Sequence, residues 1–173
     1  MRGKNEQGFT LIELLIVVAI ISIIAAIAVP GLLRARMTGN ETSAIASLKV
    51  TTTSQVAYSA ACGNGAYAAT YVVLGTPPVA GGEGFISSDL GSVATPQKSG
   101  YNFDMVAGAG SAAGPNDCLG TATITAYYAT GEPMTVNTTG TRAFAVNAGN
   151  TIWQVAGAAA PAEPFAAPAT PIQ

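Results

Sequence analysis

The chain has 173 residues, of which 9% are charged and 49% hydrophobic, and its formal net charge is -2. This length leaves room for one modest domain and one apolar segment, because a well-formed core takes roughly 100 to 150 residues. The sequence holds no histidine, which excludes serine–histidine and cysteine–histidine nucleophile systems and the commonest general base. We therefore expect a protein that is not an enzyme, with no catalytic residue, metal or cofactor.

The N-terminus is polar for eight residues (MRGKNEQG) and then strongly apolar. Its two basic residues favour a cytoplasmic location for this end. The next 21 residues, 9–29, contain three polar side chains, one of them Glu13, and as a helix they would span about 31 Å, enough to cross a bilayer. A secretory signal peptide is the competing interpretation, but its apolar core is usually ~7 to 15 residues and precedes the small residue at its cleavage site. Here the small residue, Gly8, comes first.

The order of residues at this junction is a specific motif: a basic leader ending in Gly8, then Phe9, then TLIEL with Glu13 as the fifth residue after the glycine. The stretch resembles the N-terminus of bacterial type IV prepilins and the related pseudopilins. The resemblance covers about the first 30 residues. It implies that a membrane prepilin peptidase cuts between Gly8 and Phe9 and methylates the new amine of Phe9. The alternative is an ordinary single-span anchor with a chance acid.

Glu13 stands where a charge is costly, since a carboxylate at membrane depth raises the free energy of insertion by about 2.5 to 3.5 kcal/mol at a helix centre. Cleavage would supply a partner, because the free amine of Phe9 would lie about 6 Å away along a helix and would favour the ionised carboxylate. The resemblance implies that Glu13 pairs with the Phe9 amine of a neighbouring subunit and sets the axial register of the filament.

Pro30 ends the apolar run, and a proline inside a helix predicts a kink or local unwinding around residues 22–31. Beyond it an amphipathic helix is expected to about residue 60, with its end at the CGNG sequence. Its expected apolar face is Leu33, Met37, Ala44, Leu48 and Val56, with the charged residues, Glu41 among them, on other faces.

The rest of the chain is typical of β structure and loops. Four short aromatic and β-branched runs predict antiparallel strands packed on the helix: 101–106, 123–129, 141–147 and 151–156. The turn of the last hairpin is predicted at NAGN, residues 147–150. Residues 63–100 are expected to form a connecting loop. The final proline- and alanine-rich residues are expected to form a flexible or extended tail. The fold class is α+β, a long N-terminal helix on a small antiparallel sheet, as in type IV pilins. The expected divisions are a cleaved leader (1–8), a transmembrane and filament-core helix (9–30), its amphipathic continuation (31–60), a β head (61–158) and a Pro/Ala-rich tail (159–173).

Two cysteines, Cys62 and Cys118, lie in the part expected to be exported. In an oxidising compartment a disulfide is the simplest interpretation, worth roughly 4 kcal/mol in the chain-entropy model. Two free thiols or an intermolecular bond are the alternatives.

Other candidate sites are weak. Four acids could supply calcium oxygens, as in the major pseudopilin, but no compact acidic loop is evident and solvated surface charges explain them as well: Glu83, Asp89, Asp104 and Asp117. Asn40 and Asn137 begin glycosylation triplets, a short pattern with a high chance rate. After loss of the leader, five basic and eight acidic side chains remain, which gives no support for nucleic-acid binding by the subunit.

The sequence therefore predicts a structural subunit, a major pilin, that starts in the inner membrane and ends in an extracellular filament. Its implied partners are the membrane before assembly, the prepilin peptidase, an inner-membrane assembly platform with its ATPase, and further copies of itself. A pseudopilin of a type II secretion system is the alternative within the family. A membrane-tethered ligand-binding domain is the alternative from another class.

Overall fold

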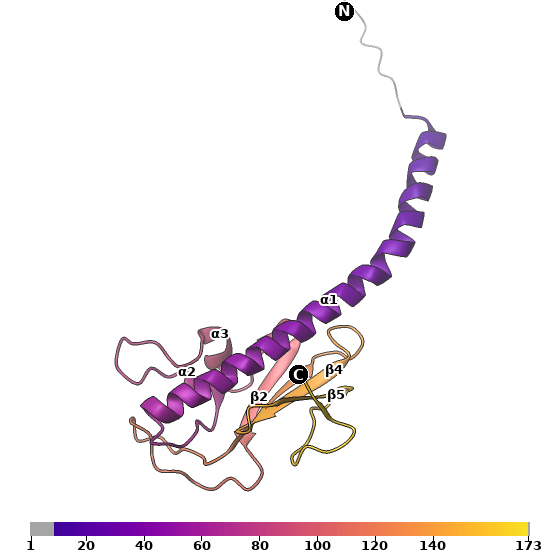
Figure 1. Ribbon diagram of the computed structural model, residues 1–173. Coiled ribbons are helices and arrows are strands. Elements are labelled where there is room, and N and C mark those ends of the chain that lie inside the picture. Colours follow the sequence, from indigo (N-terminus) through magenta and orange to yellow (C-terminus); the bar gives the residue numbers. More distant parts are fainter. Residues whose placement is uncertain (1–8, 173) are drawn as a thin grey trace, which may run out of the picture. The chain divides into compact units, whose positions relative to one another are not determined.

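The computed structural model describes residues 9–172, so the expected cleavage residue Gly8 lies outside the described part. The chain divides into two units, Met1–Arg36 and Met37–Gln173. One long helix, α1 (Leu11–Ala61), begins in the first unit and ends in the second (Figure 1). With a six-stranded antiparallel sheet it forms the α+β architecture that the sequence predicts.

The first unit is the apolar part of α1. Pro30 lies inside the helix and has no N–H to donate to the carbonyl of Ala26. All of residues 22–31 are nevertheless helical. The local unwinding expected there is not present in this chain, and a kink at Pro30 stays a prediction.

The CGNG sequence ends α1 at Ala61, as predicted. Asn64 and Gly65 have φ values of 51° and 86°, in the left-handed region that asparagine and glycine tolerate. The chain then turns back along the helix, where the side-chain amide of Gln55 bonds both backbone groups of Ala68, at 2.8 and 2.9 Å.

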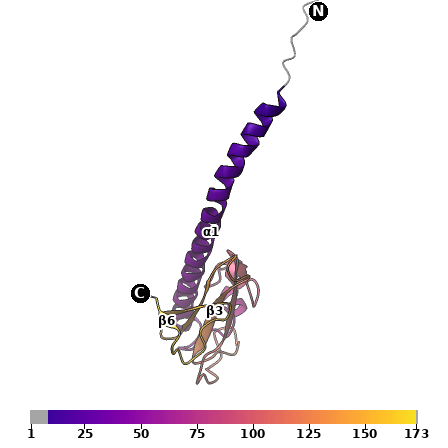
Figure 2. The ribbon, with the colours of Figure 1, turned by 90° about the vertical axis from the view of Figure 1, so that its right-hand side faces the viewer.

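Six strands form one sheet in sequence order, each antiparallel to the next. Figure 2 shows the C-terminal part of α1 on one face of this sheet. The inward-facing aromatic side chains of the strands form the core with Ala44 and Leu48 of the helix. The strands are β1 (Gln97–Lys98), β2 (Tyr101–Ala107), β3 (Tyr127–Pro133), β4 (Arg142–Asn147), β5 (Ile152–Ala156) and β6 (Thr170–Pro171).

Three of the four expected strands lie close to their predicted positions, as does the turn between β4 and β5. The remaining one, β3, begins at Tyr127 and runs through Gly131 to Pro133, residues that normally favour a strand end. Gly131 is tolerated because a Cβ there would come within 3.2 Å of the Phe103 ring and 3.7 Å of Leu48 on α1. The strand therefore passes through glycine where helix and sheet approach closely.

The segment 63–100 is more than the connecting loop that we expected. It contains α2 (Tyr71–Gly75), α3 (Ser88–Gly91) and β1. Gly75 and Gly91 pack backbone to backbone, since a Cβ on Gly75 would lie 2.2 Å from the Gly91 carbonyl oxygen. The segment also contributes fully or nearly fully buried core side chains, namely Tyr71, Leu74, Ile86 and Leu90.

The buried face of α1 differs from the apolar face that we predicted. Ala44 and Leu48 are fully buried, but Leu33 and Val56 are 50% and 51% exposed. The side chains that face the sheet and loops are mainly polar, namely Glu41, Ser47, Thr51, Ser54 and Gln55. The side chains of Glu41, Thr51, Ser54 and Gln55 all make hydrogen bonds to groups outside α1; the Ser54 hydroxyl, for example, donates to the Phe85 carbonyl at 2.8 Å. Burial of polar groups is tolerated when they are paired in this way.

Glu41 is the most consequential of these buried groups and is only 5% exposed. One carboxylate oxygen accepts the Nε and Nη2 of Arg142 on β4, at 3.0 and 2.6 Å, and the other accepts the N–H and hydroxyl of Thr141, at 2.8 and 2.7 Å. Burial raises the pKa of Glu41, but the hydrogen bonds from Arg142 and Thr141 outweigh it and hold the pKa below its usual value. The ion pair fastens α1 to the sheet.

The C-terminal residues, for which we expected a flexible or extended tail, are packed on the head. Phe165 stacks on Trp153 with ring centroids 5.1 Å apart. Glu163 accepts hydrogen bonds from the Asn147 side chain and the Ala109 backbone, both at 2.6 Å. The segment then adds β6 to the sheet edge. Aromatic stacking and charge-assisted bonds thus hold a sequence whose composition alone suggests disorder.

Cys62 and Cys118 form a disulfide with Cα atoms 4.8 Å apart. Beside it, the Tyr58 hydroxyl donates to Asp117 at 2.8 Å. Burial raises the pKa of Asp117, but hydrogen bonds from the Thr121 N–H, Tyr58 and the Leu119 N–H outweigh it, so the pKa lies below its usual value. The end of α1 is thus joined covalently and by hydrogen bonds to the segment before β3.

Glu41→Gln should lower the free energy of unfolding by about 2 kcal/mol at pH 7, because a charge-assisted network is lost. Since the pKa of Glu41 is lowered in the folded state, its contribution is present above the ordinary Glu value, about 4.3, and is lost as pH falls below it. Urea unfolding followed by Trp153 fluorescence should therefore show a smaller difference from wild type at pH 3. Asp89→Asn, which breaks an exposed pair with Lys98, is the control and should cost under about 1 kcal/mol. An equal deficit at both pH values would contradict the assignment.

Replacing both cysteines with serine should lower the free energy of unfolding by roughly 4 kcal/mol, because the 56-residue separation makes a large loop in the unfolded chain. Cys118→Ser alone should cost about the same, since either change opens the loop. Urea midpoints of the detergent-solubilised chains measure both. A double variant as stable as wild type would show that the bond does not constrain the unfolded state.

Candidate functional site

The first unit presents an uncovered apolar surface. Phe9 and Leu11 are 84% and 80% exposed, and the large apolar side chains that follow in the helix are likewise exposed. Among the described residues, α1 is the one helix long and apolar enough to cross a membrane, a property that a signal sequence would share. Such a surface is unfavourable in water and needs lipid or protein against it. We call residues 9–29 the assembly segment.

The carboxylate of Glu13 closes a hydrogen-bonded ring at the start of this segment. Its Oε2 accepts the Thr10 N–H at 2.9 Å and the Thr10 hydroxyl at 2.6 Å, and the Glu13 N–H donates back to the Thr10 hydroxyl at 3.3 Å. This is a capping box, which satisfies backbone donors that a helix N-terminus leaves unpaired.

The capping box leaves part of the carboxylate free. No described residue donates to Oε1 of Glu13, and an ionised carboxylate can accept about four hydrogen bonds. The ring also draws Glu13 back towards Thr10, the residue after Phe9. Thr10 is not among the site residues predicted from the sequence, although the Thr-x-x-Glu spacing in TLIE is the standard signal for this cap.

The candidate calcium ligands are not brought together. Asp89 pairs with Lys98 at 2.6 Å, and Asp117 is engaged by Tyr58. Within residues 9–172, no three acidic or sulfur-bearing side chains are placed to hold a metal ion. Of the two glycosylation candidates, the Asn40 amide nitrogen donates to the Thr139 carbonyl at 2.9 Å, while Asn137 is exposed in a turn.

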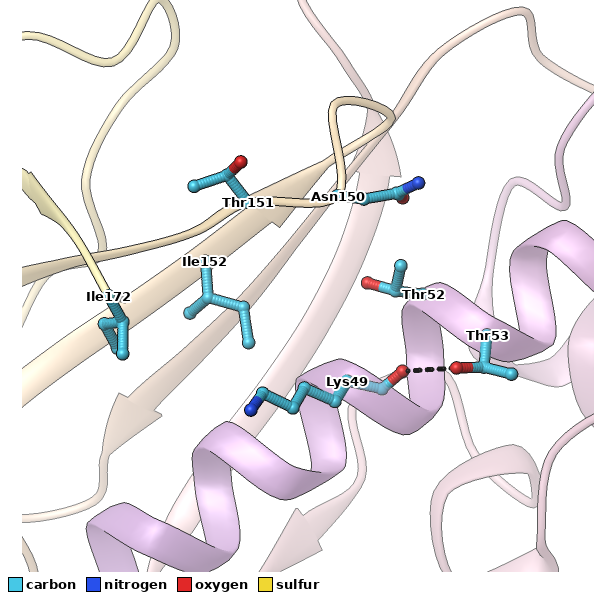
Figure 3. A pocket seen from close by; sticks show the side chains of 7 residues that line it. All are labelled: Lys49, Thr52, Thr53, Asn150, Thr151, Ile152 and Ile172. Carbon is cyan, nitrogen blue, oxygen red and sulfur yellow. Dashed lines mark hydrogen bonds between the residues drawn. The ribbon is translucent and has the colours of Figure 1, made fainter.

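A groove opens in the second unit between α1 and the β4–β5 hairpin (Figure 3). It encloses about 410 Å³ and is lined by residues 49, 52 and 53 of α1, residues 150–152, and Ile172. Lys49 lies along one wall, hydroxyl and amide groups line the opening, and Ile152 and Ile172 are apolar. We call it the Lys49 groove. The sequence offered no signal for it, because its walls are 100 residues apart in the chain.

Comparison with known proteins bears on the assembly segment above all. The family model described as the prokaryotic N-terminal methylation motif matches residues 3–29. The chain is 58% identical over 45 residues to the type IV wide pilus major component PilA4 of Thermus thermophilus. The aligned stretch covers 26% of this chain and 34% of that protein. It is 46% identical over 56 residues to the type IV major pilin protein PilA of Myxococcus xanthus. This second aligned stretch covers 32% of this chain and 26% of that protein.

These matches span about a third or less of either relative's length. No solved structure matches the chain significantly. The methylation motif, the two pilin relatives and the architecture of a long apolar helix with an antiparallel sheet together support placing the chain in the type IV pilin family.

Proposed function

We propose that the chain is the major structural subunit of a type IV pilus and catalyses no reaction. The observation that carries this proposal is the assembly segment, an exposed apolar helix that directly follows a prepilin-type junction. Both relatives are named as major components of such filaments. The second unit, with its own core and disulfide, would form the head that each subunit contributes to the filament surface.

In this proposal the precursor is first inserted in the inner membrane. The assembly segment spans the bilayer while the two basic residues of the leader stay in the cytoplasm. A prepilin peptidase then cuts between Gly8 and Phe9 and methylates the Phe9 amine. The assembly platform and its ATPase supply the work of extraction. The finished filament lies outside the cell.

Extraction is possible only if the apolar surface is covered again. Packing the assembly segments of many copies side by side replaces lipid with protein contacts, so the exposed leucine, isoleucine and valine side chains become the filament core. Pro30 lies one residue beyond this segment and lacks one helical hydrogen bond. We propose that it is the site where the helix kinks when the copies pack.

Glu13 would set the axial position of each incoming copy. Its Oε2 is committed to the Thr10 cap, and its Oε1 would receive the methylated amine of Phe9 from a neighbouring subunit. Inside an apolar bundle that pair is strongly favoured over two unpaired charges. A copy at the wrong height would leave both charges buried and unpaired.

Electron microscopy of filaments sheared from cells, with mass spectrometry of the same sample, tests the proposed function. Thin filaments made mostly of this chain, with subunits beginning at methylated Phe9, are the expected result. A methylated chain confined to the envelope, without surface filaments, would overturn the major-pilin assignment in favour of a pseudopilin. A chain that keeps residues 1–8 would overturn both.

Glu13→Ala should leave the protein in the membrane and cleaved, but with filament yield reduced about tenfold or more, because the charge pair is lost. Glu13→Gln is the matched control, since its amide oxygen can still accept from Thr10 but carries no charge. Immunoblots of sheared and membrane fractions measure both. Normal filament yield from the Gln variant would show that the cap, not the charge, is what assembly needs.

A further inference from the structure

Lys49 is the one basic side chain among residues 37–172 without an ion-pair partner. The other two are engaged, Lys98 with Asp89 at 2.6 Å and Arg142 with Glu41 at 2.6 Å. Lys49 is exposed and lies along the wall of its groove (Figure 3). A groove with a cation on one wall and apolar side chains beside it is suited to bind a segment that carries both a carboxylate and an apolar side chain.

The second unit also holds one acid of the complementary kind. Of the seven acidic side chains in residues 37–172, Glu83 alone has neither a hydrogen bond nor an ion pair within the described residues. It is exposed on the loop between α2 and α3. Asp104 is the nearest rival, and the N–H of Met105, the next residue, donates to it at 2.9 Å.

The loop that carries Glu83 is exposed and contains a tight turn. A turn closes with the Gly82 N–H donating to the Val79 carbonyl at 3.0 Å, and Gly81 has a φ of 78°. Val79 is 65% exposed although it is apolar. Glu83 follows directly, between glycines that add no side chain. The loop therefore offers an apolar side chain and a carboxylate four residues apart.

Lys49 and Glu83 of one chain are kept apart by α1 itself. The Ser54 hydroxyl faces the Glu83 side of the head, where it donates to Phe85 at 2.8 Å. Lys49 faces the β4–β5 hairpin on another side. Five residues of an α-helix turn through about 140° beyond a full circle, so the two side chains leave the helix region in different directions. Within the described residues of one chain the two side chains form no ion pair with each other, so a contact between them is sought between two copies.

We propose that the Glu83 loop of one copy seats in the Lys49 groove of the next, with Val79 against the partly exposed Ile172. Two different surfaces meet in this contact, so it is heterologous and repeats without closing when the rotation between copies allows, as a helical filament requires. The proposal rests on the proposed function and adds a contact between heads to the contact between assembly segments.

The groove can also complete the hydrogen bonding of the incoming carboxylate. Oδ1 of Asn150 accepts the Tyr127 hydroxyl at 3.4 Å, which leaves the amide nitrogen as a donor. An ion pair between a carboxylate and an ammonium is stronger when a neutral donor also binds the carboxylate and an apolar surface keeps water away than when the pair lies in open solvent.

A charge exchange in the full-length chain tests the contact. Lys49→Glu and Glu83→Lys should each lower the yield of sheared filaments about tenfold, because each places like charges in the interface. The double variant K49E/E83K should restore the yield to within about twofold of wild type. Immunoblots of the membrane fraction check that each variant is made and cleaved as wild type is.

Asp104→Lys is the matched control, alone and with Lys49→Glu, and should not restore the yield. Normal filaments from either single variant, or a double variant no better than the singles, would overturn the contact. The failure of the proposed function is distinguishable, because wild-type cells would then yield no filaments of this chain at all.

Discussion

The uncovered apolar helix at the N-terminus is the constraint on which the rest of this protein depends. More than a dozen large aliphatic side chains stand open to the surroundings, and in water they would drive indiscriminate association. Lipid can cover them first and other copies later, and both environments exclude charge. Every polar feature of the segment is therefore arranged around this exclusion, from the Thr10 cap to the half-free carboxylate of Glu13.

Much of the fold follows from local sequence signals. The long apolar run predicts the first part of α1, and the CGNG sequence predicts where the helix ends. Runs of β-branched and aromatic residues predict β2, β4 and β5. Two cysteines in a head expected to be exported predict the disulfide. Each of these features depends on a few neighbouring residues, or, for the disulfide, on the chain having only two cysteines. A single sequence is therefore enough to predict them.

Features decided by distant contacts could not be predicted. Glu41 looked like a solvated helix charge, and only β4 supplies the arginine that allows it to be buried. Gly131 looked like a strand end, and the Phe103 ring of the neighbouring strand, 3.2 Å from where a Cβ would stand, makes glycine suitable there. The C-terminal residues have the composition of a linker, yet Trp153 offers Phe165 a ring to stack on. In the candidate site, the Thr-x-x-Glu cap was readable and was missed.

Two of the contacts that fasten the helix to its head differ in kind. Near Met37 the fastening is an ion pair through Glu41, and at the far end it is a covalent bond through Cys62, about 31 Å further along the helix. Tension applied through the helix would reach the ion pair before the disulfide. The head could then yield reversibly at its near end while the covalent bond keeps residues 62–118 attached.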